Sequence, residues 1–175
     1  MNDPSLVFTL LFSALLVLGL LTKFYLATRQ IRHVAQHRNQ VPAAFASTIT
    51  LAAHQKAADY TIAKARLGLL EMAFASALLL GWTLLGGIDL LNRAIVNSGL
   101  TAYGSLVPQL VLLAAFGLIS GLLDLPFTLY KTFRLEERFG FNKMTFKLWL
   151  VDLVKSTVVG IVVGLPIVAL ILWLM

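Results

Sequence analysis

The sequence predicts an all-α membrane protein, a polytopic bundle of four transmembrane helices. Of its 175 residues, 59% are hydrophobic and 13% are charged, whereas soluble domains carry about 45–50% apolar and about 25% charged residues. The mean hydropathy is +0.86. The chain also contains no cysteine, which excludes a disulfide framework and any thiolate metal site. Membrane insertion is therefore expected to organise the whole chain.

A spanning helix needs about 20 mainly apolar residues, and four segments meet this requirement. The predicted spans cover residues 5–27, 67–90, 105–130 and 146–175. Lys23 is close enough to the end of the first span for its ammonium group to reach the interface. Asp124-Leu125-Pro126 predicts a break or bend in the third span, and Pro166 predicts a kink in the fourth.

The distribution of Lys and Arg predicts the orientation of these spans. The connection from Thr28 to Arg66 carries six of them, the stretch from Lys131 to Lys155 carries six, and the link between the second and third spans carries Arg93 alone. Short basic connections stay in the cytoplasm. We therefore expect cytoplasmic loops at about residues 28–66 and 131–145 and an outside N-terminus. The net charge of +6 then predicts contact with the bilayer and its anionic headgroups, and no nucleic-acid binding.

Composition also predicts details of the connections and the chain ends. The Ala-, Leu- and Lys-rich segment "LAAHQKAADYTIAKARLGLLEM" predicts a helix that runs into the second span, separated by Val41-Pro42 from an extension of the first. The start "MNDPS" lacks the basic region of a signal peptide, so the first span should be retained. The sequence ends at "VALILWLM" within an apolar run, which favours a fragment of a longer protein over a naturally short one.

The segment "HVAQH" places His33 and His37 on one helix face, as a zinc-binding helix would. The catalytic version has Glu directly after the first His, and here that residue is Val34. We therefore expect interfacial histidines, with a real metal site at His33 and His37 as the weaker alternative, and we assign no metal role to His54.

Small residues in the spans predict helix packing, and acidic side chains near the span ends predict contact with interfacial water. Gly117 with Gly121 and Gly160 with Gly164 form two Gly-x-x-x-Gly pairs, a spacing that allows close packing of helices. The carboxylates near the span ends are expected to be solvated at the interface: Glu71, Asp89, Asp124 and Asp152. Asp152 could also pair with Lys155 at i+3.

The densest run of charge is "FRLEERFGFNKMTF", between the third and fourth spans. Neighbouring residues of a helix point about 100° apart, so Glu136 and Glu137 should not converge on one substrate atom. We expect them to pair with nearby Arg or Lys or to dock another domain, with Gly140 in a turn and Asn142 as a cap. The candidate structural or docking loop is Glu136, Glu137, Arg138, Phe139, Gly140, Phe141 and Asn142.

The stretch "LPFTLYKTFRLEERFGFNKMTFKLWLVDLVKS" resembles the N-terminal membrane domain of the type I CAAX prenyl proteases, which are integral-membrane zinc metallopeptidases. The residues that carry the resemblance are Pro126, Tyr130, Phe133, Glu136, Glu137, Phe139 to Asn142, Thr145, Asp152 and Lys155. The first connection, "RQIRHVAQHRNQVPAAF" followed by "HQKAADYTIAKARLG", is similar to the first cytoplasmic loop of that family.

The resemblance implies a ring of membrane helices around a water-filled chamber, with zinc on a His-Glu-x-x-His helix that follows a fifth span. This sequence has no His-Glu-x-x-His, so no catalytic or zinc-binding residue can be assigned and the chain alone should be inactive. The implied role is to form part of the chamber and to brace a missing C-terminal peptidase domain that cleaves membrane-associated peptides or prenylated C-termini. A bacterial inner membrane is the expected location. The alternative is a free-standing four-span scaffold or partner subunit that binds anionic lipid or protein.

Overall fold

The computed structural model describes residues 4–174, and its long helices agree in number with the predicted spans. The elements are α1 (Pro4–Gln36), η1 (Ala43–Phe45), α2 (Leu51–Thr83), α3 (Gly87–Asn97), η2 (Leu100–Tyr103), α4 (Leu106–Tyr130), η3 (Lys131–Glu136) and α5 (Phe146–Leu174). Within the described residues, four helical segments are long and apolar enough to cross a membrane. The chain is therefore all-α and multi-pass; position 175 of the fourth predicted span lies outside the described residues.

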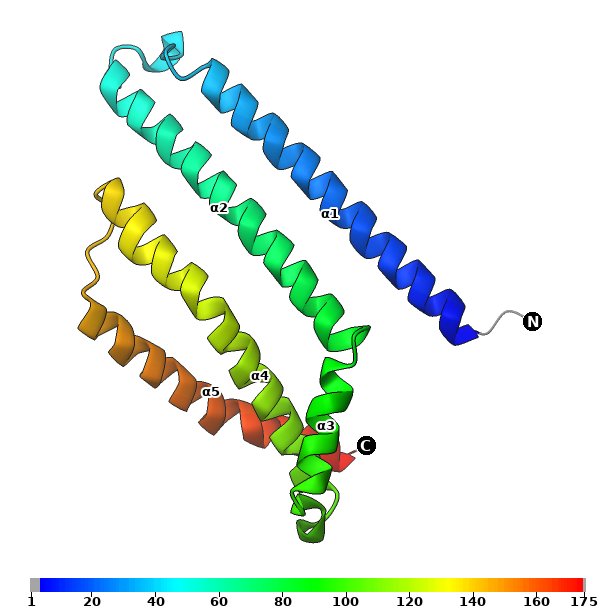
Figure 1. Ribbon diagram of the computed structural model, residues 1–175. Helices are drawn as coiled ribbons and strands as arrows, with labels where there is room; N and C mark the ends of the chain where they lie inside the picture. The colour runs from blue at the N-terminus through cyan, green and yellow to red at the C-terminus, as the bar shows by residue number, and fades with distance from the viewer. Residues whose placement is uncertain (1–3, 175) are drawn as a thin grey trace.

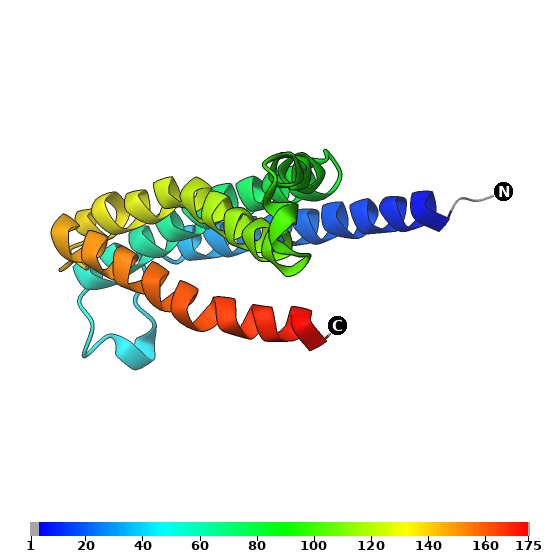
Figure 2. The ribbon, with the colours of Figure 1, turned by 90° about the horizontal axis from the view of Figure 1, so that it is seen from below.

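The long helices follow one another in the order α1, α2, α4, α5 (Figures 1 and 2). The α1 and α2 helices run side by side, and aromatic rings join α2 to α4. Phe74 meets Phe127 and Trp82 meets Phe116, each at 5.0 Å between ring centroids. Both the α1–α2 connection and the α4–α5 connection lie at one end of the molecule, opposite the start of α1 and the end of α5. We call this end the basic end.

The first two helices extend well beyond their predicted spans at the basic end. The α1 helix continues to Gln36, and α2 begins at Leu51, where the Oγ1 of Thr50 accepts a hydrogen bond of 3.2 Å from the Ala53 amide. The predicted helix leading into the second span is thereby confirmed. Pro42 stands before η1 in the connection, so the predicted separation is also confirmed.

The predicted end of the second span at Leu90 is wrong, because α2 ends at Thr83. Gly86 adopts a left-handed φ of 79°, and Gly87 then packs against the preceding helix. A Cβ at Gly87 would lie 2.7 Å from the Gly81 carbonyl oxygen. Asp89 therefore belongs to the separate helix α3, where it pairs with Arg93 at 2.6 Å. Hydropathy alone does not register this turn because the residues on both sides of it are apolar.

The third helix is not broken at its proline. The α4 helix runs through Pro126, although its direction changes along its length in Figure 2, and it continues into the π-helical segment η3. Much of the predicted 131–145 loop is thus helical. The α5 helix begins at Phe146 as predicted and runs through Pro166. Its first turn is capped by Thr145, whose Oγ1 accepts a hydrogen bond of 3.3 Å from the Leu148 amide.

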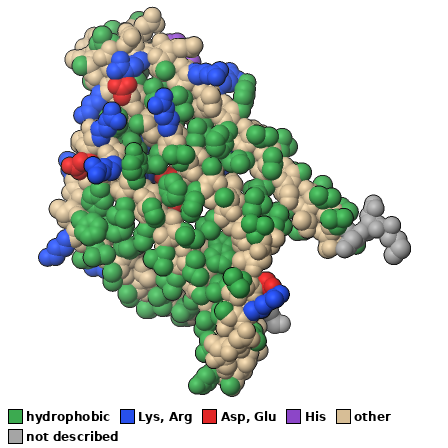
Figure 3. Space-filling view, in the orientation of Figure 1, with side chains coloured by type: hydrophobic (Ala, Val, Ile, Leu, Met, Phe, Trp, Pro, Cys, Tyr) green, Lys and Arg blue, Asp and Glu red, His purple; other side chains and the backbone are tan. Residues whose placement is uncertain are grey.

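Burial is confined to a few residues. Among the described residues the buried hydrophobic side chains are Ala58, Leu67, Ile95, Leu135, Phe139 and Trp149. Large apolar side chains elsewhere are widely exposed, and Figure 3 shows them along the helices, whereas Lys and Arg gather at the basic end. Exposed apolar helices are stable in lipid, where no hydrophobic force drives one helix against another.

Candidate functional site

The charged block after α4 is an ordered helix end rather than an open loop. Gly140 has a φ of 74°, its amide donates to the Glu137 carbonyl at 3.0 Å, and the Phe141 amide donates to the Glu136 carbonyl at 2.9 Å. This pair of hydrogen bonds is the Schellman arrangement, which requires a left-handed residue at the position of Gly140. The predicted turn at Gly140 is therefore confirmed.

A small hydrophobic core fixes this helix end to α2. Phe139 packs with Leu67 and Leu135, and all three are buried. Tyr60 of α2 contacts Phe139 and Phe141 edge to face, with ring centroids at 5.3 and 4.8 Å. The rings hold the helices in register, because edge-to-face aromatic pairs are favourable beyond their buried area.

Basic side chains surround these aromatic rings. The Lys56 ammonium lies 5.7 Å from the Phe141 centroid, and the Lys64 ammonium lies 5.6 Å from that of Tyr60. Arg138 lies over Phe139 at 5.7 Å. Such cation–π contacts orient the basic side chains, so the positive charge at this end is positioned by the core beneath it.

The predicted ion pairs of Glu136 and Glu137 are absent from the described part of the chain. Glu137 instead accepts a hydrogen bond of 2.9 Å from the Asn142 amide group, and Asn142 Oδ1 accepts one of 2.7 Å from the Met144 amide. Asn142 therefore orders the turn, while Thr145 caps α5. The Glu137 carboxylate is thus engaged by a neutral amide group rather than by Arg or Lys. The predicted pair of Asp152 with Lys155 is likewise absent from residues 4–174.

Glu136 opens onto a groove between η3 and the start of α5. The groove has a volume of about 470 Å³, and its lining includes Asn142, Lys143 and Trp149. Glu136 is half-buried and Phe141, on the same rim, is 53% exposed. A carboxylate beside an exposed ring at a well-ordered helix end is suited to binding another polypeptide. The role of these residues in docking stays a prediction.

Sequence reasoning missed a bidentate ion pair at the same end. Arg38 donates from Nε to Asp59 Oδ1 at 2.7 Å and from Nη2 to Oδ2 at 2.8 Å. Asp59 lies in the half of α2 that precedes its apolar segment. The hydrogen bond from Arg38 lowers the pKa of Asp59 below its ordinary value, and the charges of Arg38 and Arg138 act in the same direction. No sequence signal joins these residues, because 21 positions separate them.

The histidines of the first connection bind backbone groups. His37 Nδ1 donates to the His33 carbonyl at 2.8 Å, and His54 Nε2 donates to the His37 carbonyl at 3.0 Å. No group of three or more His, Cys, Asp or Glu able to hold a metal ion occurs among residues 4–174. The described residues thus do not by themselves provide the ligand set of the zinc site that the family resemblance implies.

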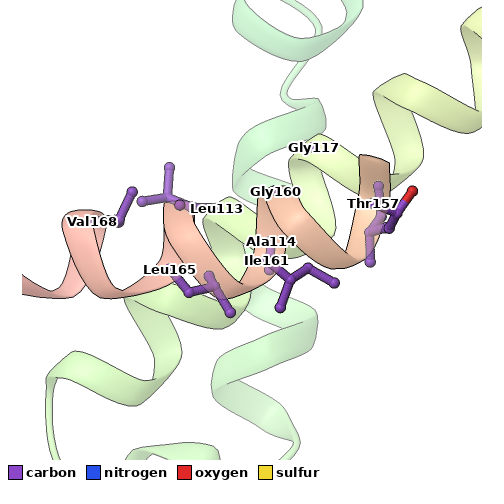
Figure 4. Close-up of a pocket in the computed structure, with 10 residues that line it drawn as sticks. Leu113, Ala114, Gly117, Thr157, Gly160, Ile161, Leu165 and Val168 are labelled. Carbon is purple, nitrogen blue, oxygen red and sulfur yellow. The ribbon is translucent and has the colours of Figure 1, made fainter. Parts of the chain in front are cut away.

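The paired glycines line an open groove. Gly117 of α4 and Gly160 and Gly164 of α5 border an apolar groove of about 380 Å³ (Figure 4). A Cβ on any of these glycines or on Gly121 would meet no atom within 4 Å. The close α4–α5 contact that the sequence predicts is therefore not formed here, because the helices diverge from their link at the basic end. A role in packing against another helix stays a prediction.

Comparison with known proteins identifies the family. Residues 30–175 match the family model described as CAAX prenyl protease N-terminal, five membrane helices. The chain belongs to this family. CAAX prenyl protease 1 of Saccharomyces cerevisiae is 27% identical over 98% of the chain and 39% of its own length. A homolog from Oryza sativa subsp. japonica is 42% identical over 43% of the chain and 18% of its own length.

The fold of this CAAX prenyl protease N-terminal domain is also similar to that of a solved relative. The crystal structure of S. mikatae Ste24p superposes with a TM-score of 0.85 at 27% identity, over 97% of this chain and 39% of that one. The present chain thus spans about two fifths of the length of these two relatives. The resemblance to the CAAX prenyl protease family that the sequence predicts is confirmed.

Proposed function

We propose that this chain forms part of the wall of a membrane chamber and braces a peptidase domain at its basic end. The observation that carries the proposal is the likeness to S. mikatae Ste24p over 97% of this chain but 39% of that protein. The remaining length of such relatives is where a peptidase domain would be found. The family resemblance implies that zinc belongs to that domain, and we assign no chemical step to the residues of this chain.

The proposed orientation places the basic end in the cytoplasm. The two connections at this end carry most of the Lys and Arg residues of the chain, and the opposite end carries Arg93. The positive-inside rule assigns the basic side to the cytoplasm, where anionic headgroups would attract it. A bacterial inner membrane as the host membrane stays a prediction.

The surface proposed for the peptidase domain is the groove beside Glu136. It combines a carboxylate with no ion-pair partner in the described residues, the exposed ring of Phe141 and the ordered turn at Asn142. Because Phe139 and Tyr60 fix this turn to α2, a partner bound there would be held in a defined position relative to the membrane helices.

Co-purification tests this function. The chain, carrying an affinity tag, is produced together with the C-terminal portion of S. cerevisiae CAAX prenyl protease 1, and the complex is isolated in detergent. We expect co-elution, weakened at least several-fold by Glu136→Gln combined with Phe141→Ala. The matched control is Asp89→Asn on α3, at the opposite end, which should leave co-elution unchanged. If the two portions never associate, the chain would have to act as a free-standing scaffold.

A further inference from the structure

The long helices exceed the thickness of a bilayer. The candidate spans contain 33, 33, 31 and 29 residues, which at a rise of 1.5 Å per residue gives lengths of about 43 to 50 Å. The hydrocarbon core is about 30 Å thick. Each helix must therefore project from the hydrocarbon by roughly 13 to 20 Å, or by less if it is tilted. The distribution of charged and buried side chains indicates which end of each helix projects.

One ionisable residue in each long helix lies near a common level. Lys23 of α1 borders a small groove together with Met72 and Ser76 of α2. Glu71, from the adjacent turn of α2, shares a second groove with Asp124 and Thr128 of α4. Asp124 and Thr128 also line a third groove, which contains Asp152 of α5. We call Lys23, Glu71, Asp124 and Asp152 the charged layer.

The charged layer borders a slab without formal charge. No Asp, Glu, Lys or Arg occurs in residues 4–22, 106–123 or 156–174 of α1, α4 and α5, or in residues 72–83 of α2. The three longer stretches correspond to about 27 to 29 Å of helix at 1.5 Å per residue, close to the thickness of the hydrocarbon core. Beyond the slab, Asp89 and Arg93 form an exposed ion pair on α3. The uncharged slab therefore lies between the charged layer on one side and the Asp89–Arg93 ion pair on the other.

Burial changes at the same layer. The core of Leu67, Leu135 and Phe139 lies on the basic side of it, as do Ala58 and Trp149, whereas the remaining buried residue, Ile95, belongs to α3 beyond the other end of the slab. Within the slab, by contrast, Leu15 is 67% exposed and Val162 is 64% exposed. Water drives apolar side chains into a core, whereas lipid does not. The position of the core therefore indicates, independently of charge, which part of the molecule lies in water.

We propose that the charged layer marks the edge of the hydrocarbon core, and that the helical ends beyond it form a raised platform in water. This placement rests on the proposed function and deepens it, because it sets the height at which a partner domain would be bound. Lys64 and Lys131 each lie seven residues beyond the layer, counted from Glu71 and Asp124. That is about two helical turns, or roughly 10 Å of helix, which places them at the outer edge of the headgroups. Glu136 lies about 18 Å of helix beyond Asp124 at 1.5 Å per residue, outside a headgroup zone about 5 to 8 Å thick.

Spin-label depth measurements test the placement, and the absence of native cysteine makes single-cysteine variants straightforward. The full chain is reconstituted in phosphatidylcholine vesicles with a nitroxide at one exposed site at a time. Collision rates with oxygen, which concentrates in hydrocarbon, and with a water-soluble nickel chelate then give depth irrespective of orientation. The matched pairs are Ala57→Cys with Ala77→Cys on α2, and Arg134→Cys in η3 with Leu122→Cys on α4.

We expect the labels at 57 and 134 to collide mainly with nickel and those at 77 and 122 mainly with oxygen. Labels stepped along both helices should change from one behaviour to the other on the basic side of Glu71 and Asp124, within about two turns of them. Oxygen-dominated collisions at 57 or 134, or nickel-dominated collisions at 77 or 122, would overturn the placement. Because no peptidase portion is present, this result is independent of whether the two portions associate.

Discussion

Gly140 shows how one backbone angle supports the whole basic end. Its φ of 74° lets the chain leave η3 and turn toward α5 while the last helical carbonyls keep hydrogen-bond donors. The same turn sets Phe139 against Leu67 and leaves Phe141 on the rim of the groove. Glycine, which has no Cβ, adopts this left-handed conformation at little cost in free energy. L-residues are destabilised there because their Cβ approaches the backbone too closely.

Gly140→Ala should therefore destabilise the chain by about 1 to 2 kcal/mol, the cost of a left-handed L-residue. Thermal unfolding in detergent, followed by circular dichroism, measures the change. Gly19→Ala is the matched control, because Gly19 is helical and an added Cβ would meet no atom within 4 Å. The control should match or exceed the parent protein in stability. Equal midpoints for Gly140→Ala and the parent would contradict this role.

The Arg38–Asp59 pair should give the fold a dependence on acid pH. Because the pKa of Asp59 is lowered in the folded chain, its contribution is present above the ordinary carboxyl pKa and is lost as pH falls through the lowered folded value. Asp59→Asn should therefore lower the unfolding temperature at pH 7 but show a smaller further loss on acidification than the parent. Asp89→Asn, which removes a more exposed pair, is the control. Parallel pH profiles for Asp59→Asn and the parent would contradict this.

At the scale of elements, the small hydrophobic core joins α2 to η3 and the turn that follows it. Phe139, in that turn, is 7% exposed, whereas Phe141, two residues later, is 53% exposed. The two phenylalanines contact the same Tyr60 ring, so they differ mainly in burial.

Phe139→Ala should cost about 3 to 5 kcal/mol, as truncation of a buried phenylalanine does, and Phe141→Ala should cost under about 1.5 kcal/mol, the net worth of an exposed aromatic pair. Denaturant unfolding of both variants in the same detergent gives the comparison. Similar losses for the two variants would show that the core is not centred on Phe139.

In the α4–α5 groove, by contrast, we expect a substitution to leave stability unchanged or to raise it. Gly160 faces open space, so Gly160→Ala should leave stability unchanged or raise it by up to about 1 kcal/mol through helix propensity. If instead the variant loses more than about 1 kcal/mol, the helices pack closely at the glycines, as Gly-x-x-x-Gly spacing predicts. Unfolding measured in the isolated chain separates the two outcomes.

At the scale of the molecule, the sequence predicts the fold class and the number of spans because apolar runs of bilayer length have few alternatives. The α4 start near Ser105 and the α5 start at Phe146 follow from local signals and are confirmed within a residue. Local signals do not predict the end of α2, which depends on the tight approach of Gly87 to Gly81, or the Arg38–Asp59 pair, which forms across a long connection. The charged block allows the family to be predicted from the sequence. Its hydrogen bonds could not be predicted, because they depend on the geometry of the turn at Gly140.

The proposed function, as the N-terminal membrane part of a CAAX prenyl protease, has one most direct test. The most direct measurement is the activity of a chimaera in which residues 1–175 replace the matching N-terminal part of S. cerevisiae CAAX prenyl protease 1, assayed in vesicles on a prenylated CAAX peptide. We expect cleavage by the chimaera that a zinc chelator abolishes, and no cleavage by the unfused chain. A chimaera that inserts and folds, with the parent's thermal stability, yet cleaves nothing would contradict it.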